Sequence, residues 1–131
     1  MKVFISYDRS DQEWAQQLAS SLSAAGHVVW YDRNILPGDN WGLELGKALE
    51  ESNAMIVLLS PDGVKSPYVQ REIEYALSSK KYEGRLIPVV VRPTTDIPWV
   101  LRRLDLVRAG KKPNEVTRLV IEHLRRTPIN R

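Results

Sequence analysis

The chain of 131 residues contains no cysteine, so it forms no disulfide and offers no thiol as a nucleophile or metal ligand. Its two histidines, His27 and His123, lie far apart in the sequence, which leaves no pattern for a zinc site. No apolar run approaches the roughly 20 residues that span a bilayer, and the start lacks the pattern of a secretory signal. We therefore expect no bound metal, no membrane contact and a cytoplasmic location.

The motifs of several common enzyme classes are also missing. The stretch SYDRSD, after the first apolar run, lacks the glycines of a dinucleotide-binding turn, and no glycine-rich loop ends in Lys-Ser or Lys-Thr. No Gly-x-Ser-x-Gly elbow is present, and Ser60 stands where a phosphoacceptor receiver domain carries an aspartate. The net charge of +3 is spread over 19 basic and 16 acidic residues without a basic, aromatic-interleaved cluster, so we expect no nucleic-acid partner.

Five short apolar runs alternate with helical patterns along the chain. The runs begin at Val3, Val28, Ala54, Leu86 and Leu104. Such short, continuous runs are typical of strands that are buried on both faces, and parallel strands need helical crossovers between them. The sequence therefore predicts an α/β fold in which helices cover both faces of a five-stranded parallel sheet. We expect residues 1–131 to form one domain, with residues 126–131 as a C-terminal tail.

The ends of the predicted helices are marked by specific residues. The first helix is predicted to begin at a capping box, Ser10 to Glu13, and to end at Gly26. Ser66 is expected to cap the third helix, with Pro67 at its first position. The remaining predicted helical segments are residues 40–52, at most one turn after Val91, and a helix after Pro113.

Polar residues follow the predicted strands at the edge where ligands usually bind in folds of this kind. They are Ser6, Asp8 and Arg9 after the first strand, Asp32 after the second, Ser60 after the third and Arg92 after the fourth. Turn and cap chemistry explains several of them without any ligand, so both interpretations stay open here.

The predicted third helix carries two glutamates, Glu72 and Glu74, in its middle. Residues four apart share a helix face, so Tyr68 lies one turn before Glu72, and Glu72 lies at the border of the apolar stripe. Glu74 falls on the other side of Ile73 and is expected to be a surface residue. On this local pattern alone, Glu72 is better explained as a partly exposed helix residue than as a catalyst.

The ordered set of these segments resembles a TIR domain. The boxes that carry the resemblance are VFISY from Val3, VVWYD from Val28, LPG from Leu36, IVLLS from Ile56, and Ser66 ahead of Arg71-Glu72-Ile73. The resemblance spans nearly the whole chain and implies a flavodoxin-like, three-layer fold with the strand order 2-1-3-4-5. TIR domains are of two kinds, namely scaffolds for signalling complexes and enzymes that cleave NAD+ at the nicotinamide–ribose bond.

In the enzymatic members, the glutamate of the helix after the third strand is catalytic, and Glu72 aligns with it. The resemblance thus implies that NAD+ is a substrate rather than a cofactor, with Tyr68 against the nicotinamide or ribose and Arg9 near a phosphate. The other substrate-binding residues implied are Ser6, Asp8, Asp32, Gly38, Trp41 and Ser60. The loop from Arg33 to Trp41, with Leu36, Pro37 and Gly38, is expected to gate the site and to mediate self-association.

Two differences from well-known TIR domains indicate which members of the family this chain resembles. The Trp-Cys pair common in plant members is replaced by Tyr68-Val69, and the Phe-Trp box of animal adaptors is missing, since Phe4 is the chain's only phenylalanine. These differences favour bacterial members, many of which act in antiphage defence or as effectors, with a sensor domain or a protein partner controlling assembly. A non-enzymatic interaction module and a nucleoside deoxyribosyltransferase relative remain as alternatives. Hydrolysis and cyclisation of the ribosyl group are both open.

Overall fold

The computed structural model describes residues 1–31, 41–104, 106–108 and 113–126. Its centre is a parallel sheet of five strands, β1 (Lys2–Ser6), β2 (Val28–Trp30), β3 (Ala54–Leu59), β4 (Leu86–Val90) and β5 (Val107–Arg108). The strand order is β2-β1-β3-β4-β5, and each neighbouring pair is parallel. The predicted fold class and strand order are confirmed.

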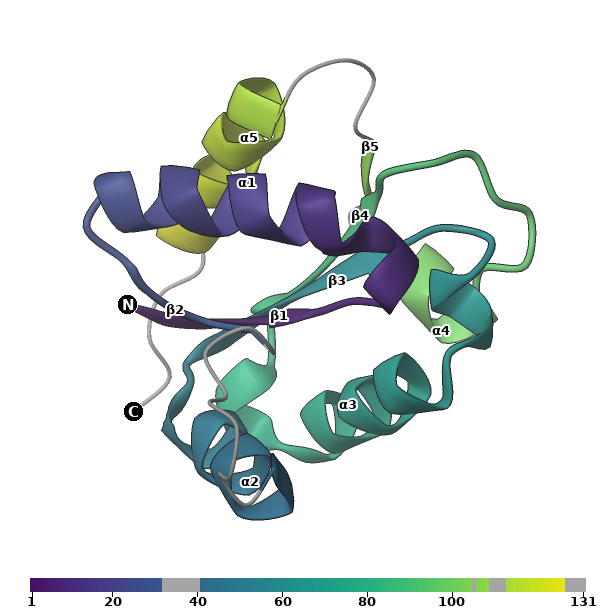
Figure 1. The fold of residues 1–131 in the computed structure, drawn as a ribbon, viewed down its shortest axis with the longest axis horizontal. Helices are drawn as coiled ribbons and strands as arrows, with labels where there is room; N and C mark the ends of the chain where they lie inside the picture. The colour runs from purple at the N-terminus through teal and green to yellow at the C-terminus, as the bar shows by residue number, and fades with distance from the viewer. Residues whose placement is uncertain (32–40, 105, 109–112, 127–131) are drawn as a thin grey trace.

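Helices cover both faces of the sheet (Figure 1). One face carries α1 (Gln12–Ala24) and α5 (Pro113–Arg126), and the other carries α2 (Trp41–Glu51) and α3 (Pro67–Ser78). A single helical turn, α4 (Trp99–Arg102), follows β4, and short 3₁₀ turns within the described residues lie at 9–11, 63–65 and 80–82. Among the described residues, no helix is both long and apolar enough to cross a bilayer.

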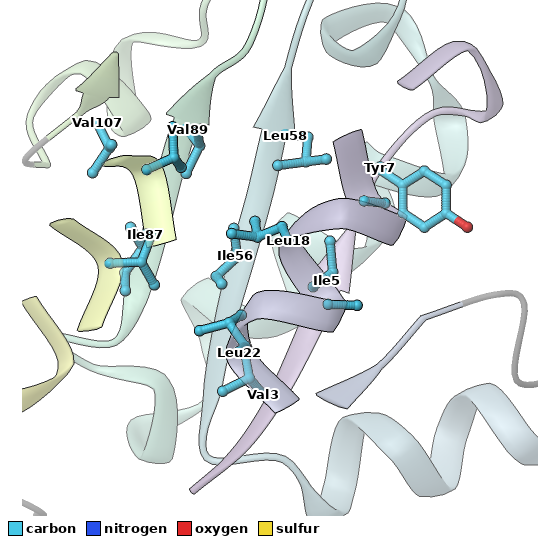
Figure 2. Packing of buried hydrophobic residues seen from close by; sticks show 14 of the residues in the cluster. Val3, Ile5, Tyr7, Leu18, Leu22, Ile56, Leu58, Ile87, Val89 and Val107 are labelled. Carbon is cyan, nitrogen blue, oxygen red and sulfur yellow. The ribbon is translucent and has the colours of Figure 1, made fainter. Parts of the chain in front are cut away.

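The side chains of each central strand alternate between the two helical layers, as the period of two in a strand requires. Figure 2 shows one of these layers. The side chains that pack there against Leu18 and Leu22 of α1 are Val3 and Ile5 of β1, Tyr7 just after it, Ile56 and Leu58 of β3, and Ile87 and Val89 of β4. Phe4 packs on the opposite side with residues of α2 and α3. Ser6 is two residues after Phe4 in the strand, so its side chain points to the same face of the sheet, toward α3.

Most of the predicted helix ends are confirmed. Gly26 ends the first helix with a φ of 96°, a value that glycine adopts without strain. Ser66 caps α3 by accepting a hydrogen bond of 3.4 Å from the Val69 amide, and Pro67 is the first helical residue. The predicted capping box is wrong, because Ser10 lies within a 3₁₀ turn capped by Asp8, and α1 begins only at Gln12.

Two strands differ from the prediction of strands buried on both faces. β2 is the edge strand of the sheet, and its Val28 is 61% exposed. β5 contains two residues, which pair only with Val89 and Val90 of β4. Both differences arise at the sheet edges, where a strand has one neighbour and less apolar cover.

His27 connects α1 to β2, and its Nδ1 is buried without a hydrogen-bond partner among the described residues. Burial lowers the pKa of His27 below its ordinary value of about 6.5, and the nearby Arg125 guanidinium acts in the same direction. The folded chain thus favours the neutral imidazole, while the unfolded chain takes up a proton as the pH falls below about 6.5. We expect the free energy of unfolding to decrease between pH 7.5 and pH 5.5.

Urea unfolding at the two pH values measures this effect, and His27→Gln should reduce the loss of stability because it removes the titrating group. His123→Gln replaces the other histidine and serves as the matched control, which should keep most of the wild-type pH dependence. An equal pH dependence in the wild type and in His27→Gln would contradict the assignment to His27.

Candidate active site at the carboxyl edge of the sheet

A buried pair of polar side chains, Ser6 and Glu72, lies between the end of β1 and the middle of α3. The Ser6 hydroxyl donates a hydrogen bond of 2.6 Å to Oε1 of Glu72. Ser6 is fully buried and Glu72 is 6% exposed. A carboxylate is rarely buried unless a partner offsets its desolvation. The interpretation of Glu72 as a partly exposed helix residue is therefore wrong, because its side chain is buried and accepts a hydrogen bond from Ser6.

The position of Glu72 follows from the register of α3. Val69, Ile73 and Ala76 form the buried stripe that packs under the sheet, and Glu72 lies beside that stripe on the side of β1. Tyr68, one turn before Glu72, is 57% exposed. Glu74 is exposed, as predicted. The helix therefore presents one covered carboxylate with an accessible aromatic ring one turn away.

A second polar cluster lies on the other face of the sheet, where the parity of β3 directs Ser60 toward the start of α1. The Ser60 hydroxyl donates to Oδ2 of Asp11 at 2.5 Å, and both residues are buried. The other carboxylate oxygen of Asp11 accepts from Nε of Arg92 at 3.1 Å and lies 3.0 Å from Nη2 of Arg92. Arg92 follows β4, so this cluster joins the carboxyl ends of β3 and β4 to the entry of α1.

The turn after β3 is built around the same serine. The Gly63 amide donates to Oγ of Ser60 at 2.9 Å, and a Cβ at position 63 would lie 2.8 Å from the Leu58 carbonyl oxygen. Only glycine fits so close to the end of the strand. Asp62, in the same turn, lies 3.6 Å from Nη2 of Arg92. Ser60 is thus engaged by protein groups on both sides, and its predicted role in binding a substrate stays a prediction.

The residues that follow β1 have different environments. Asp8 caps the 3₁₀ turn by accepting from the Ser10 amide at 3.0 Å and from the Ser10 hydroxyl at 2.7 Å. These hydrogen bonds lower the pKa of Asp8, and the charge of Arg92 acts in the same direction. Arg9 is exposed at the same edge of the sheet. The predicted substrate contacts of Asp8 and Arg9 stay predictions.

Several predicted residues lie outside the described part of the chain, namely Asp32, Leu36, Pro37 and Gly38. Trp41 begins α2, and its side chain is likewise outside the described set. The loop that was assigned to gating and self-association therefore stays a sequence-based prediction.

Sequence reasoning missed Asp11, which was treated as part of a helix cap. One signal could have revealed it, because the parity that places Ile56 and Leu58 on the α1 side places Ser60 there as well. A serine fully buried at that position needs a hydrogen-bond partner, and Asp11 is the acid nearest in sequence to the start of α1.

Chemically, the Ser6–Glu72 pair offers a single carboxylate held in a fixed position at the edge where ligands of such sheets bind. A carboxylate of this kind can stabilise a cationic carbon beside it or attack that carbon as a nucleophile. A fixed carboxylate of this kind fits a reaction in which positive charge develops on the substrate. Separately, the described residues contain no cluster of three metal-ligating side chains.

A family model and several known proteins are similar to this chain. A family model described as TIR domain matches residues 3–120. The NAD(+) hydrolase PdTIR of Paracoccus denitrificans is 34% identical over 91 residues, which are 66% of this chain and 30% of that protein. The probable 2′ cyclic ADP-D-ribose synthase TcpO of Methanobrevibacter olleyae is 27% identical over 90 residues, covering 67% of this chain and 26% of that protein.

Solved structures show the same architecture. The TIR domain of the Toll-related receptor TRR-2 from Hydra magnipapillata superposes with a TM-score of 0.74 at 27% identity, covering 95% of this chain and 94% of that domain. This chain thus covers nearly all of that solved TIR domain, whereas the segments aligned with the two curated relatives span less than a third of each relative.

Proposed function

Since this chain belongs to the TIR domain family, we propose that it is an NAD+ glycohydrolase in which Glu72 is the catalytic residue. The observation that carries the proposal is the buried Glu72 carboxylate, held by the Ser6 hydroxyl at 2.6 Å on the edge of the sheet where substrates bind. The resemblance to PdTIR and TcpO supports NAD+ as the substrate class, because the names of both relatives refer to that chemistry.

The proposed reaction needs only one carboxylate. The bond between N1 of nicotinamide and C1′ of the ribose breaks, and nicotinamide leaves with the electron pair as a neutral molecule, so little general-acid help is required. Positive charge develops on C1′ and the ring oxygen of the ribose, and the Glu72 carboxylate stabilises or traps that charge. Water then attacks C1′ and loses a proton, which gives ADP-ribose, or a hydroxyl group within the same molecule attacks and gives a cyclic product.

The neighbouring residues receive roles that match their exposure. The exposed ring of Tyr68 packs against the nicotinamide or the ribose, and the exposed Arg9 guanidinium meets a phosphate. Ser6 positions Glu72 through their hydrogen bond. Asp8, Asp32, Gly38 and Trp41 contact the substrate around Glu72, and Ser60, which is fully buried, acts indirectly by holding the turn after β3.

We place the enzyme in bacterial immune or effector signalling, with activation by self-association through Leu36, Pro37 and Gly38 of that loop. In a protein that is longer than this chain, a sensor domain would control the association.

If assembly completes the site, the rate of nicotinamide release per chain should rise with protein concentration. Assays over a range of chain concentrations, with and without a crowding agent, measure this directly, and a rate that is proportional to concentration throughout would contradict activation by assembly.

Product analysis tests the proposed reaction. We expect purified chain to convert NAD+ into equal amounts of nicotinamide and of ADP-ribose or its cyclic isomer, as resolved by mass spectrometry. Deoxynucleosides, supplied in place of NAD+, should stay intact. Release of free base from deoxynucleosides without turnover of NAD+ would assign the chain instead to the deoxyribosyltransferase class of glycosyl chemistry.

A second candidate function is a non-enzymatic interaction module. It is favoured by the similarity to the TIR domain of a Toll-related receptor. In that case Gly38→Arg should abolish self-association or partner binding, whereas Glu72→Gln should leave the signalling output in cells unchanged. If the chain is an enzyme, both substitutions should remove that signalling output.

A further inference from the structure

A cavity of about 690 Å³ lies at the amino edge of the sheet, away from the Ser6–Glu72 pair. Its walls come from the last turn of α3 (residues 76–78), from Tyr82 in the 3₁₀ turn that follows, and from Leu86 at the start of β4. Arg103 and Leu104, after α4, complete the walls. Ser6 and Ser60 lie at the opposite ends of their strands, and neither they nor Glu72 line this cavity. The volume is within the range of roughly 300–1,000 Å³ that is typical of sites for small organic ligands.

The pairing of β5 with β4 is short and stops before this edge of the sheet. The Val91 amide donates to Leu59, and the Arg85 carbonyl accepts from Met55, so odd-numbered residues of β4 direct their backbone groups toward β3. By alternation, Leu86 directs its N–H and C=O groups to the other side, where β5 begins only opposite Val89. Within the described residues, the ladder therefore gives the Leu86 backbone no partner in β5, and Leu86 is one of the residues that line the cavity.

The walls of the cavity are largely apolar. Leu77, Leu86 and Leu104 line it, and of these Leu77 is 47% exposed whereas Leu86 is 6% exposed. The hydroxyl of Tyr82 donates to the Leu49 carbonyl oxygen at 2.6 Å, so its polar end is satisfied within the protein. An apolar ligand body would cover surface that water now contacts.

The rim of the cavity carries more positive than negative charge. Lys80 and Arg103 are exposed there, and neither forms an ion pair with another described residue. Glu83 is the one acid among the described residues that line the cavity. By contrast, Arg92 at the other edge of the sheet is already paired with two aspartates. The cations at the rim favour an anionic group on the ligand.

We propose that this cavity binds a small organic anion whose apolar body lies against Leu77, Leu86 and Leu104 and whose carboxylate, sulfonate or phosphate lies near Lys80 and Arg103. Such a ligand combines the two chemistries that the walls and the rim present. The site is separate from the proposed NAD+ site, and its existence does not depend on the proposed activity. Because Ala76 lies one turn after Glu72 in α3, a bound ligand would contact the same helix that holds Glu72.

The probe for this site is 8-anilinonaphthalene-1-sulfonate, an aromatic anion whose fluorescence increases in apolar surroundings. Titration of the whole folded chain should show saturable binding with one probe per chain. The double variant Lys80→Gln/Arg103→Gln should weaken this binding by about tenfold or more, because two charge-assisted contacts are lost. The double variant Lys65→Gln/Arg102→Gln makes the same charge change at exposed positions outside the cavity, and it should bind as the wild type does.

A second pair of variants tests the apolar wall. Leu77→Gln should weaken binding several-fold, whereas Leu43→Gln, at an exposed leucine of α2, should leave it unchanged. Circular dichroism and urea unfolding establish that every variant is folded as the wild type is. The proposal is overturned if the wild type shows no saturable binding, or if the Lys80/Arg103 and Lys65/Arg102 double variants bind equally well.

Discussion

Glu72→Gln is expected to lower the rate of nicotinamide release from NAD+ by at least about 100-fold. The substitution removes the negative charge that stabilises the ribosyl cation but keeps the shape of the side chain. The amide oxygen of the introduced glutamine can still accept the Ser6 hydroxyl, which donates at 2.6 Å in the wild type. We therefore expect the free energy of unfolding to change by no more than about 1 kcal/mol. Nicotinamide release by liquid chromatography and urea unfolding measure the two effects on the same preparations.

Glu74→Gln is the matched control for this experiment, because it makes the same change on the same helix at an exposed position. It should retain wild-type activity. Wild-type rates in Glu72→Gln, or an equal loss in both variants, would show that the Glu72 carboxylate is not the group that supports the reaction. A loss of activity together with a loss of folding would instead indicate that Ser6 and Glu72 act in stability alone.

Asp11→Asn is expected to lower the free energy of unfolding by about 2 to 3 kcal/mol. The Asp11 side chain is 1% exposed and accepts hydrogen bonds from Ser60 and Arg92 on its two oxygens. An asparagine offers one acceptor oxygen and one NH₂ donor group. The NH₂ group would therefore face either the Ser60 hydroxyl or the Arg92 guanidinium, where Asp11 presents an acceptor oxygen. The expected cost is below that of a fully buried ion pair, because the Arg92 side chain is 44% exposed and water can solvate it. Urea unfolding at pH 7.5 gives the difference.

Asp62→Asn provides the control, since Asp62 also contacts Arg92, at 3.6 Å, but has a side chain that is 61% exposed. Its replacement should cost less than about 1 kcal/mol, as is typical of exposed ion pairs. Equal effects of the two substitutions would mean that burial of Asp11 contributes nothing to stability, and that the cluster at the ends of β3 and β4 is not what joins them to α1.

The fold was predictable because its signals are local and repeated. Short apolar runs, Ser66 and Pro67 at the start of α3, and Gly26 after α1 each specify one element, and the alternation of strands and helices then permits few topologies. The capping box at Ser10 failed because other partners compete for its residues. Asp8, two residues earlier, accepts from the Ser10 amide and hydroxyl, and Asp11 is held by Ser60 and Arg92, which lie far along the chain.

The site was predictable only in part, for a related reason. Periodicity placed Glu72 beside the apolar stripe of α3, but its burial depends on β1, which lies 66 residues earlier and brings Ser6 against it. No local pattern in the third helix contains that contact. The resemblance to TIR domains, rather than the helix itself, was what favoured Glu72 as a catalyst, and the structure adds the covered, hydrogen-bonded setting that the local pattern lacked.

The most direct test of the proposed site is a crystal structure of the chain with a carbocyclic NAD+ analogue, in which a methylene group replaces the ring oxygen of the nicotinamide ribose and prevents cleavage. We predict that the carbon equivalent to C1′ lies about 3 to 3.5 Å from a carboxylate oxygen of Glu72, as expected for reacting atoms. The Tyr68 ring should lie against the nicotinamide or the adjoining ring. An analogue bound elsewhere, for example in the cavity lined by Leu77 and Arg103, with Glu72 still covered, would contradict the assignment of Glu72 as the catalytic residue.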